Sequence, residues 1–186
     1  MLFRSDVAVE WVNGHQEPIG GLHVVVEVDE SVFFKRKYNR GQRHEHSWVF
    51  GVVGRKTGAT VVSTVPNRSA EQLLPLINRW ILPGSVMVSD MWRAYNSIGN
   101  MGNFYTHFTL NHSVEYARMD EYRGEPFQVH TNTTEGEWSL LKKQYKTMNG
   151  MSEELFETYE FVYRNFLPNN FFGHFVQWVN TFYEHN

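Results

Sequence analysis

Apolar and polar residues occur in blocks along the chain, and three blocks near its start predict β-strands. Residues 22–28 (LHVVVEV) form a nearly continuous β-branched run, as in a strand that is buried on both faces. Residues 47–54 and 59–65 are two further β-rich runs, separated by the turn sequence RKTG. Together the three blocks predict an antiparallel meander.

After Pro66 the spacing of apolar residues changes from that of a strand to that of a helix. Ser69 is a candidate N-cap, and apolar residues then recur at helical spacing up to the LPG at 82–84, namely Leu73, Leu74, Ile77, Trp80 and Ile81. Residues 85–90 and 104–111 predict two more strands. Three strands followed by alternating helix and strand indicate an α/β fold with a mixed five-stranded sheet.

The second half of the chain predicts mainly helices. Residues 112–130 are polar with little periodicity and predict a loop or lid. A helix is expected over 131–148, where Asn149-Gly150 would end it. Additional C-terminal helices are expected from about 152 to 166 and from about 170 to 183. We therefore expect a short N-terminal extension followed by one domain that includes the C-terminal helices from about 152, over residues 1–20 and 21–186.

The composition is that of a folded domain with a sizeable core. The 186 residues are 41% hydrophobic and 20% charged. Without cysteine there is no disulfide and no cysteine-ligated zinc or iron–sulfur site. No apolar run reaches the roughly 18 residues of a membrane span, and the start lacks the apolar core of a signal peptide. We expect an intracellular protein that makes no membrane contact.

The formal net charge of −3 gives no general attraction to nucleic acid, but one segment is strongly basic. Residues 35–43 (KRKYNRGQR) contain five cations, Lys35, Arg36, Lys37, Arg40 and Arg43. Such a cluster is either a solvated loop or a surface that holds phosphates.

Acids follow two of the predicted strands. Asp29 and Asp90 each end such a strand, and side-chain alternation places Glu27 on the same face as Asp29, whereas Glu30 points the other way. For a single Asp, a turn or a helix cap is the commoner explanation. Two in one domain favour a functional site at the strand ends, where open α/β sheets bind ligands.

A third candidate acid, Glu135, lies in the helix predicted over 131–148. Asn132 precedes it by three residues and Lys142 follows it by seven, so the three share a helix face. Asn132 and Glu135 also have the spacing of a capping box, and both explanations stay open. Three converging carboxylates would repel one another. Two Mg²⁺ or Mn²⁺ ions would remove that repulsion and support in-line attack on a phosphodiester.

Several blocks occur in a characteristic order: VEVDES, KRKYNRGQR, WVFGVV, PGSVMVSDMWRAY, LNHSVEY and VHTNTTEGEWSLLK. In this order they resemble the DDE transposases of the Merlin superfamily and the related bacterial insertion-sequence (ISXO-like) transposases. The resemblance runs from about Gly21 to Lys146. It implies an RNase H-like fold and a metal-dependent enzyme that cuts transposon ends and joins them to target DNA.

Residue by residue, the resemblance implies that Asp29, Asp90 and Glu135 are the catalytic acids and the ligands of two Mg²⁺ or Mn²⁺ ions. Asn132 is the alternative for the third position, and Glu27 is a possible supporting acid. The expected DNA contacts are Lys35, Arg36, Lys37, Arg40, Arg43 and Lys142. The implied partners are transposon ends, target DNA and further copies of the chain in a homodimer or larger assembly, in the nucleus of a eukaryote or the cytoplasm of a bacterium.

Two alternatives to a transposase stay open. One is a domesticated, non-catalytic module that binds DNA or protein, and the other is a generic RNase H-like nuclease without strand transfer. The chain has only about twenty residues before the first predicted strand, where the family usually carries a DNA-binding region. Thr134 stands where the family usually has a bulky aliphatic residue before the last acid.

Histidines and aromatic residues near these blocks have simpler explanations. Five histidines could suggest a zinc site (His44, His46, His107, His112 and His130), but no pair has the i, i+4 spacing of a strong motif. Polar or DNA-facing roles are more common. Trp92 and Tyr95 could stack on a base, although packing of a helix start is the more common role.

Overall fold

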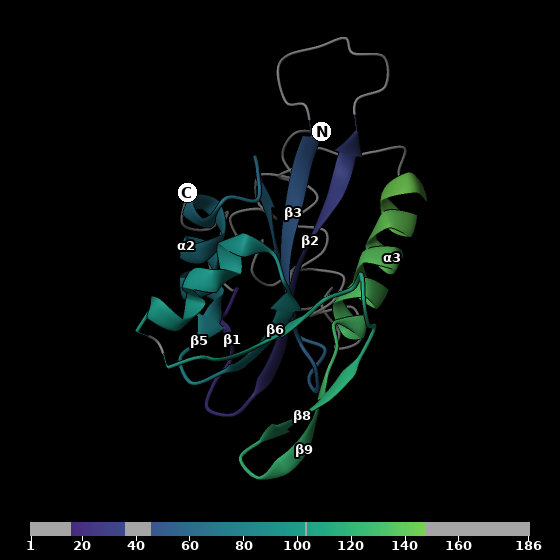
Figure 1. Ribbon diagram of the computed structural model, residues 1–186. Coiled ribbons are helices and arrows are strands. Elements are labelled where there is room, and N and C mark those ends of the chain that lie inside the picture. Colours follow the sequence, from purple (N-terminus) through teal and green to yellow (C-terminus); the bar gives the residue numbers. More distant parts are fainter. Residues whose placement is uncertain (1–15, 36–45, 103, 148–186) are drawn as a thin grey trace, which may run out of the picture.

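A five-stranded mixed sheet forms the centre of the protein, for which the computed structural model describes residues 16–35, 46–102 and 104–147 (Figure 1). The strand order is β4-β3-β2-β6-β7. The first three strands are antiparallel, and β6 and β7 run parallel to β2. Their bounds are β2 Val25–Lys35, β3 His46–Gly54, β4 Thr60–Val65, β6 Val86–Asp90 and β7 Thr106–Leu110. The α/β class and the mixed sheet are confirmed.

Helices cover both faces of the sheet. The larger core packs α2 (Ala70–Trp80) and the 3-10 helix η1 (Arg93–Asn100) against one face through buried residues that include Val26, Val28, Phe50, Leu73, Ile77 and Tyr95. The second core packs α3 (Asn132–Thr147) against the other face through Phe33, Val49, Val62, Trp138 and Leu141. Strand alternation in β2 thus sends even-numbered residues toward α2 and odd-numbered residues toward α3.

Two short strands extend the fold at its N-terminal end. Strand β1 (Ile19–Gly20) pairs in parallel with β5 (Ile81–Leu82), which follows α2 directly. Ordered structure therefore begins before residue 21.

The sequence predicted a first strand that stops at its acids. In the structure, β2 continues past them to Lys35. The antiparallel neighbour β3 pairs with β2 from Val26 to Lys35, whereas the parallel neighbour β6 pairs only from Val25 to Val28. Asp29 thus follows the last residue of β2 that pairs with β6, although it is not the end of its strand.

The loop predicted over 112–130 is in part a β-hairpin, so that prediction was wrong. Strands β8 (Arg118–Tyr122) and β9 (Glu125–Val129) are antiparallel and project from the body of the domain (Figure 1). The two turn residues, Arg123 and Gly124, have φ values of 58° and 79°. A tight turn of this kind needs positive φ at both positions, and arginine at the first of them gives no recognisable signal.

The two C-terminal helices predicted beyond residue 150 lie outside the described residues. Among the described helices, none is long and apolar enough to cross a membrane.

Gly51 makes room for the main anchor of α3. It pairs with Asp29 across the sheet, and a Cβ at this position would lie 2.4 Å from the ring of Trp138. Trp138 itself is only 6% exposed. Because Gly51 has no side chain, the indole of Trp138 can lie directly against β3.

We expect Gly51→Ala to lower the free energy of unfolding by roughly 1–3 kcal/mol, because the buried indole must shift to admit the methyl group. Chemical denaturation measures the change. The matched control is Gly136→Ala in α3, where a Cβ meets nothing within 4 Å. That control should stabilise the protein by up to about 1 kcal/mol. Equal effects of the two substitutions would contradict the packing described.

Candidate active site

Glu27 is a fully buried carboxylate at the centre of a polar network. Its residue exposure is 0%, yet both oxygens have partners. Oε1 accepts hydrogen bonds from Arg55 Nε and Thr133 Oγ1, both at 2.8 Å. Oε2 accepts from the Thr134 backbone N–H at 3.0 Å and from its hydroxyl at 3.4 Å. A buried carboxylate is tolerated only with such pairing.

Arg55 connects this carboxylate to the chain that enters α3. Its Nη1 donates to the Gln128 carbonyl and its Nη2 to the His130 carbonyl, each at 2.8 Å. His130 Nδ1 also lies 3.4 Å from Glu27 Oε1. Burial, followed by the charge of Arg55, lowers the pKa of His130 and outweighs the opposite effect of Glu27. The charge that neutralises the Glu27 carboxylate is therefore the guanidinium of Arg55.

Glu27 also caps α3, a role that the sequence had offered to Asn132 and Glu135. The first backbone bond of the helix runs from Glu135 N to Thr131 O, so Asn132 is already helical and is one residue too late for the capping box. Instead, Glu27 accepts the N–H of Thr134, the third residue of the helix, as an N-cap side chain would. Thr134 is fully buried, and its backbone N–H and its hydroxyl both bond to Glu27.

Asp29 lies two residues along β2, on the same face as Glu27. Its Oδ2 accepts the indole N–H of Trp138 at 2.8 Å. Burial raises the pKa of Asp29 from 3.8 to about 6, and the nearby Asp90 charge also raises it, against the lowering effects of Trp138 and of His112. Asp29 is thus a carboxylate with a neighbouring acid, and in the part of the chain that the structure describes it forms no ion pair.

Asp90 comes to Asp29 through the register of the parallel strands. Val28 pairs with Ser89, so the residue after each is brought to the same end of the β2–β6 pair. One Asp90 oxygen, Oδ1, accepts the Trp92 backbone N–H at 2.9 Å. Each aspartate therefore has one oxygen held by a tryptophan N–H.

Glu135 is the acid that the structure does not bring into this pair. It is exposed, and its Oε1 lies 3.6 Å from His112 Nδ1. His112 Nε2 in turn lies 2.9 Å from the Thr131 hydroxyl. Within residues 16–35, 46–102 and 104–147, no three Asp, Glu or His side chains form a group that could hold a metal ion. The alternative ligand, Asn132, is an exposed residue of the first helical turn.

The Asp29–Asp90 pair nevertheless suits a divalent cation. Both ligands offer carboxylate oxygen, which Mg²⁺ and Mn²⁺ prefer. The pKa of Asp29 stays raised because burial and the like charge of Asp90 outweigh the lowering effects of Trp138, the Glu30 backbone and His112, and a bound cation would lower it further.

The predicted DNA contacts are mostly beyond the described structure. Lys35 ends β2, but its side chain and residues Arg36, Lys37, Arg40 and Arg43 lie outside the described part. Lys142 has its ammonium 5.4 Å from the centre of the Phe33 ring, next to the α3 core. Its predicted phosphate contact stays a prediction.

Arg55 and Trp138 are parts of the site that sequence reasoning did not assign to it. Arg55 belongs to a predicted turn, and Trp138 to a predicted core stripe; neither pattern reveals a partner in a distant segment. His112 lies in a block that carries the family resemblance, and its place there suggests a residue that borders the active site. The other described histidine from the zinc hypothesis, His107, is bonded to the Ser89 hydroxyl at 2.9 Å.

Glu30 lies on the opposite face of β2, as side-chain alternation predicted. Its residue is 7% exposed, and its nearest cation is Arg68, with Nη1 3.9 Å from Oε2. Burial raises the pKa of Glu30 from 4.5 to about 8, helped by the charges of Asp29 and Asp90 and opposed by Arg68.

We expect Glu27→Gln to lower the free energy of unfolding by about 3–5 kcal/mol, because Arg55 would be left without its buried counter-charge. Denaturant titration by circular dichroism gives the value. Glu121→Gln on the exposed hairpin is the control and should change stability by less than about 0.5 kcal/mol. A loss at Glu27 no larger than at Glu121 would contradict the network.

Glu30 predicts a pH dependence of stability in buffer with EDTA. The folded chain keeps the Glu30 proton up to about pH 8, whereas the unfolded chain loses it near 4.5. Its stabilising contribution is therefore complete below pH 4.5 and is lost as pH rises toward 8, by at most about 1.4 kcal/mol per pH unit. Between pH 6.5 and 8, urea denaturation of Glu30→Gln should show a flatter profile than the parent. Identical slopes would contradict the assignment.

The fold is similar to that of retroviral integrase catalytic cores. The catalytic core domain of BIV integrase matches with a TM-score of 0.50 at 14% identity, over 86% of this chain and 97% of that chain. A chain of the simian T-cell lymphotropic virus intasome in complex with PP2A regulatory subunit B56 gamma matches with a TM-score of 0.51 at 14% identity, over 82% of this chain and 52% of that one. At this identity the likeness shows the fold alone, which is RNase H-like.

Sequence comparison identifies the family. An uncharacterized transposase-like protein of Haemophilus influenzae is 30% identical over 95 residues, which are 51% of this chain and 69% of the relative. The profile of the ISXO2-like transposase domain matches residues 12–165. The resemblance to insertion-sequence transposases is thereby confirmed, and the chain belongs to the ISXO2-like transposase domain family.

Proposed function

We propose that this domain is the catalytic domain of a DNA transposase, which cuts a phosphodiester at a transposon end and transfers the strand to target DNA. The observation that carries the proposal is the Asp29–Asp90 pair. The two acids come from adjacent parallel strands, and the charge of Asp90 contributes to the raised pKa of Asp29. Membership of a transposase family and the integrase-like fold support it.

Asp29, Asp90 and Glu135 are the residues that would hold the metal, with Asn132 as the alternative to Glu135. When bound, a pair of Mg²⁺ or Mn²⁺ ions activates the attacking oxygen and stabilises the leaving oxygen of an in-line displacement. Trp138 and Trp92 fix one oxygen of each aspartate, so that the other oxygens are oriented before a ligand arrives. In cleavage, the oxygen of water bonds to phosphorus and the bond to the departing 3′ oxygen breaks. In transfer, the oxygen of the freed 3′ hydroxyl bonds to the phosphorus of a target phosphodiester. The bond from that phosphorus to the target's own 3′ oxygen breaks, and the proton lost by the attacking hydroxyl is balanced by one gained by the departing oxygen.

One observation favours the non-catalytic alternative. Glu135 is directed toward His112 at 3.6 Å, and within the described residues the acids form no group of three. A DNA-binding module that had lost its chemistry would not need them to converge. The two functions therefore differ in whether Mn²⁺ binds at the Asp29–Asp90 pair.

We expect Asp29→Asn and Asp90→Asn each to reduce strand cleavage by roughly 10³-fold or more, since each removes a charge from the site that would stabilise the transition state. Asparagine keeps an oxygen for the tryptophan N–H bonds, so the fold should survive. Cleavage of a labelled DNA duplex with Mn²⁺, followed on a denaturing gel, measures the loss. Mn²⁺ binding, followed by electron paramagnetic resonance, should fall with it.

Asp120→Asn on hairpin β8–β9 is the matched control, because it removes an equal charge from an exposed residue away from the sheet acids. It should cleave and bind Mn²⁺ as the parent does. If the parent binds DNA but no Mn²⁺, the enzyme is refuted and the non-catalytic module is favoured. If cleavage occurs without strand transfer, the domain is a nuclease.

A further inference from the structure

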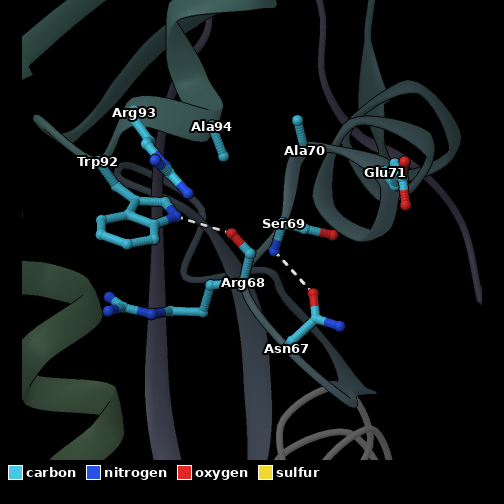
Figure 2. Close-up of a pocket in the computed structure, with 8 residues that line it drawn as sticks. All are labelled: Asn67, Arg68, Ser69, Ala70, Glu71, Trp92, Arg93 and Ala94. Carbon is cyan, nitrogen blue, oxygen red and sulfur yellow. Dashed lines mark hydrogen bonds between the residues drawn. The ribbon is translucent and has the colours of Figure 1, made fainter.

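A pocket of about 610 Å³ opens between the starts of α2 and η1, and its lining residue Trp92 follows Asp90 by two positions. It is lined by the segment that enters α2 and by the start of η1, namely Asn67, Arg68, Ser69, Ala70, Glu71, Trp92, Arg93 and Ala94 (Figure 2). Neither arginine contacts the Glu27 network or belongs to the predicted DNA-binding set. We call this the arginine pocket.

Arg68 is clamped between two tryptophans in this pocket. Its guanidinium carbon lies 4.1 Å from the ring centre of Trp48 and 4.1 Å from that of Trp92. Trp92 is anchored in turn, because its indole N–H donates to the Arg68 carbonyl at 2.7 Å. Stacking occupies the two faces of a guanidinium and leaves its N–H donors, which lie in the plane, directed outward. The clamp therefore pre-orients the guanidinium. Its Nη1 lies 3.9 Å from the buried Glu30 carboxylate, which is beyond hydrogen-bond distance, so this contact leaves the N–H donors able to bind a further anion.

A second cation and a helix start add to the same pocket. Arg93 is exposed, with its guanidinium carbon 6.0 Å from the Trp92 ring centre. The Ser69 side chain makes no capping bond to α2, so it does not satisfy the N–H groups of the first turn, to which Ala70 and Glu71 belong. In Figure 2 the Glu71 carboxylate is drawn across the pocket from both arginines. Among the residues that line the pocket, two arginines thus stand against one acid, Glu71, and the net charge is positive.

We infer that the arginine pocket binds a phosphodiester of a DNA strand that passes the acidic pair, with Arg68 and Arg93 as its ligands. The inference rests on the proposed function for the identity of the anion as DNA. Trp92 links the two places, because its backbone N–H is bonded to Asp90 and its ring packs on Arg68. A phosphate held here would set the position of the strand relative to the two aspartates.

The test is binding of a fluorescein-labelled twelve-residue oligothymidylate to the 186-residue chain in EDTA, by anisotropy over a range of salt concentrations. Arg68→Gln and Arg93→Gln should each weaken binding by roughly tenfold and reduce the slope of log K against log salt by about 0.7, the value for one lost single-strand phosphate contact. The matched control is Arg79→Gln, which also removes an arginine stacked on a tryptophan, 4.5 Å from the Trp80 ring centre, but outside the pocket. It should bind as the parent does.

Two further arms identify the anion. A methylphosphonate oligothymidylate, which has no backbone charge, should bind the parent weakly and show no effect of Arg68→Gln. Unchanged binding of that analogue would overturn phosphate recognition in favour of base stacking on the tryptophans. Inorganic phosphate at 10 mM should not displace the oligonucleotide beyond the effect of equal ionic strength; displacement would assign the pocket to a free anion instead.

The outcomes separate this inference from the proposed function. If Asp29→Asn abolishes cleavage but Arg68→Gln and Arg93→Gln bind with the affinity and salt slope of the parent, the pocket is refuted and the enzyme stands. If both arginine variants weaken binding but the parent neither binds Mn²⁺ nor cleaves, the pocket stands and the enzyme is refuted. Should Arg68→Gln fail to fold, Arg93→Gln decides, because that side chain is exposed.

Discussion

The buried ion pair between Glu27 and Arg55 is the interaction on which the geometry of the site depends. A carboxylate with no exposure is stable only while its charge and its lone pairs are matched. Here the matching groups come from the turn after β3 and from the first turn of α3, and Arg55 from that turn also holds the chain that leads into α3. Satisfying one charge therefore also fixes where the helix begins. A hydrophobic residue at position 27 could fill the space, but it could not hold α3 at this register.

The positions of the two aspartates follow from packing on opposite faces of the sheet. Trp138 reaches Asp29 because Gly51 leaves room for its ring. Trp92 holds Asp90 from the η1 side, where its ring packs on Arg68. Asp29 and Asp90 themselves lie in β2 and β6. Rigid elements of this kind place functional groups more accurately than loops do.

The sheet could be predicted from sequence because its signal is local, whereas the network around the acids could not. The β-branched runs predict strands, and the helical spacing after Pro66 predicts a helix, each from residues that are close together in the sequence. Arg55 joins Glu27 across 28 positions and the His130 carbonyl across 75, and no pattern in the turn RKTG encodes those contacts. The hairpin was missed because Arg123 occupies a position where glycine or asparagine is the usual sign.

The capping box shows how a one-residue difference changes a functional interpretation. With Asn132 as the cap, Glu135 would turn back on the helix start and be structural. With Glu27 as the cap and Asn132 already helical, Glu135 is released from that role and lies beside His112.

The carboxylates of the three acids are consequently held to different degrees. Asp29 and Asp90 are carried by paired strands and held by indole and backbone N–H groups, whereas the side chain of Glu135 is 49% exposed and its carboxylate lies 3.6 Å from His112. The backbone of Glu135 is fixed one residue from Thr134, so its carboxylate is adjusted by side-chain rotation and not by movement of α3. A cation at the two aspartates would compete with His112 for this carboxylate, and Thr131 influences that competition because it holds the other nitrogen of the ring.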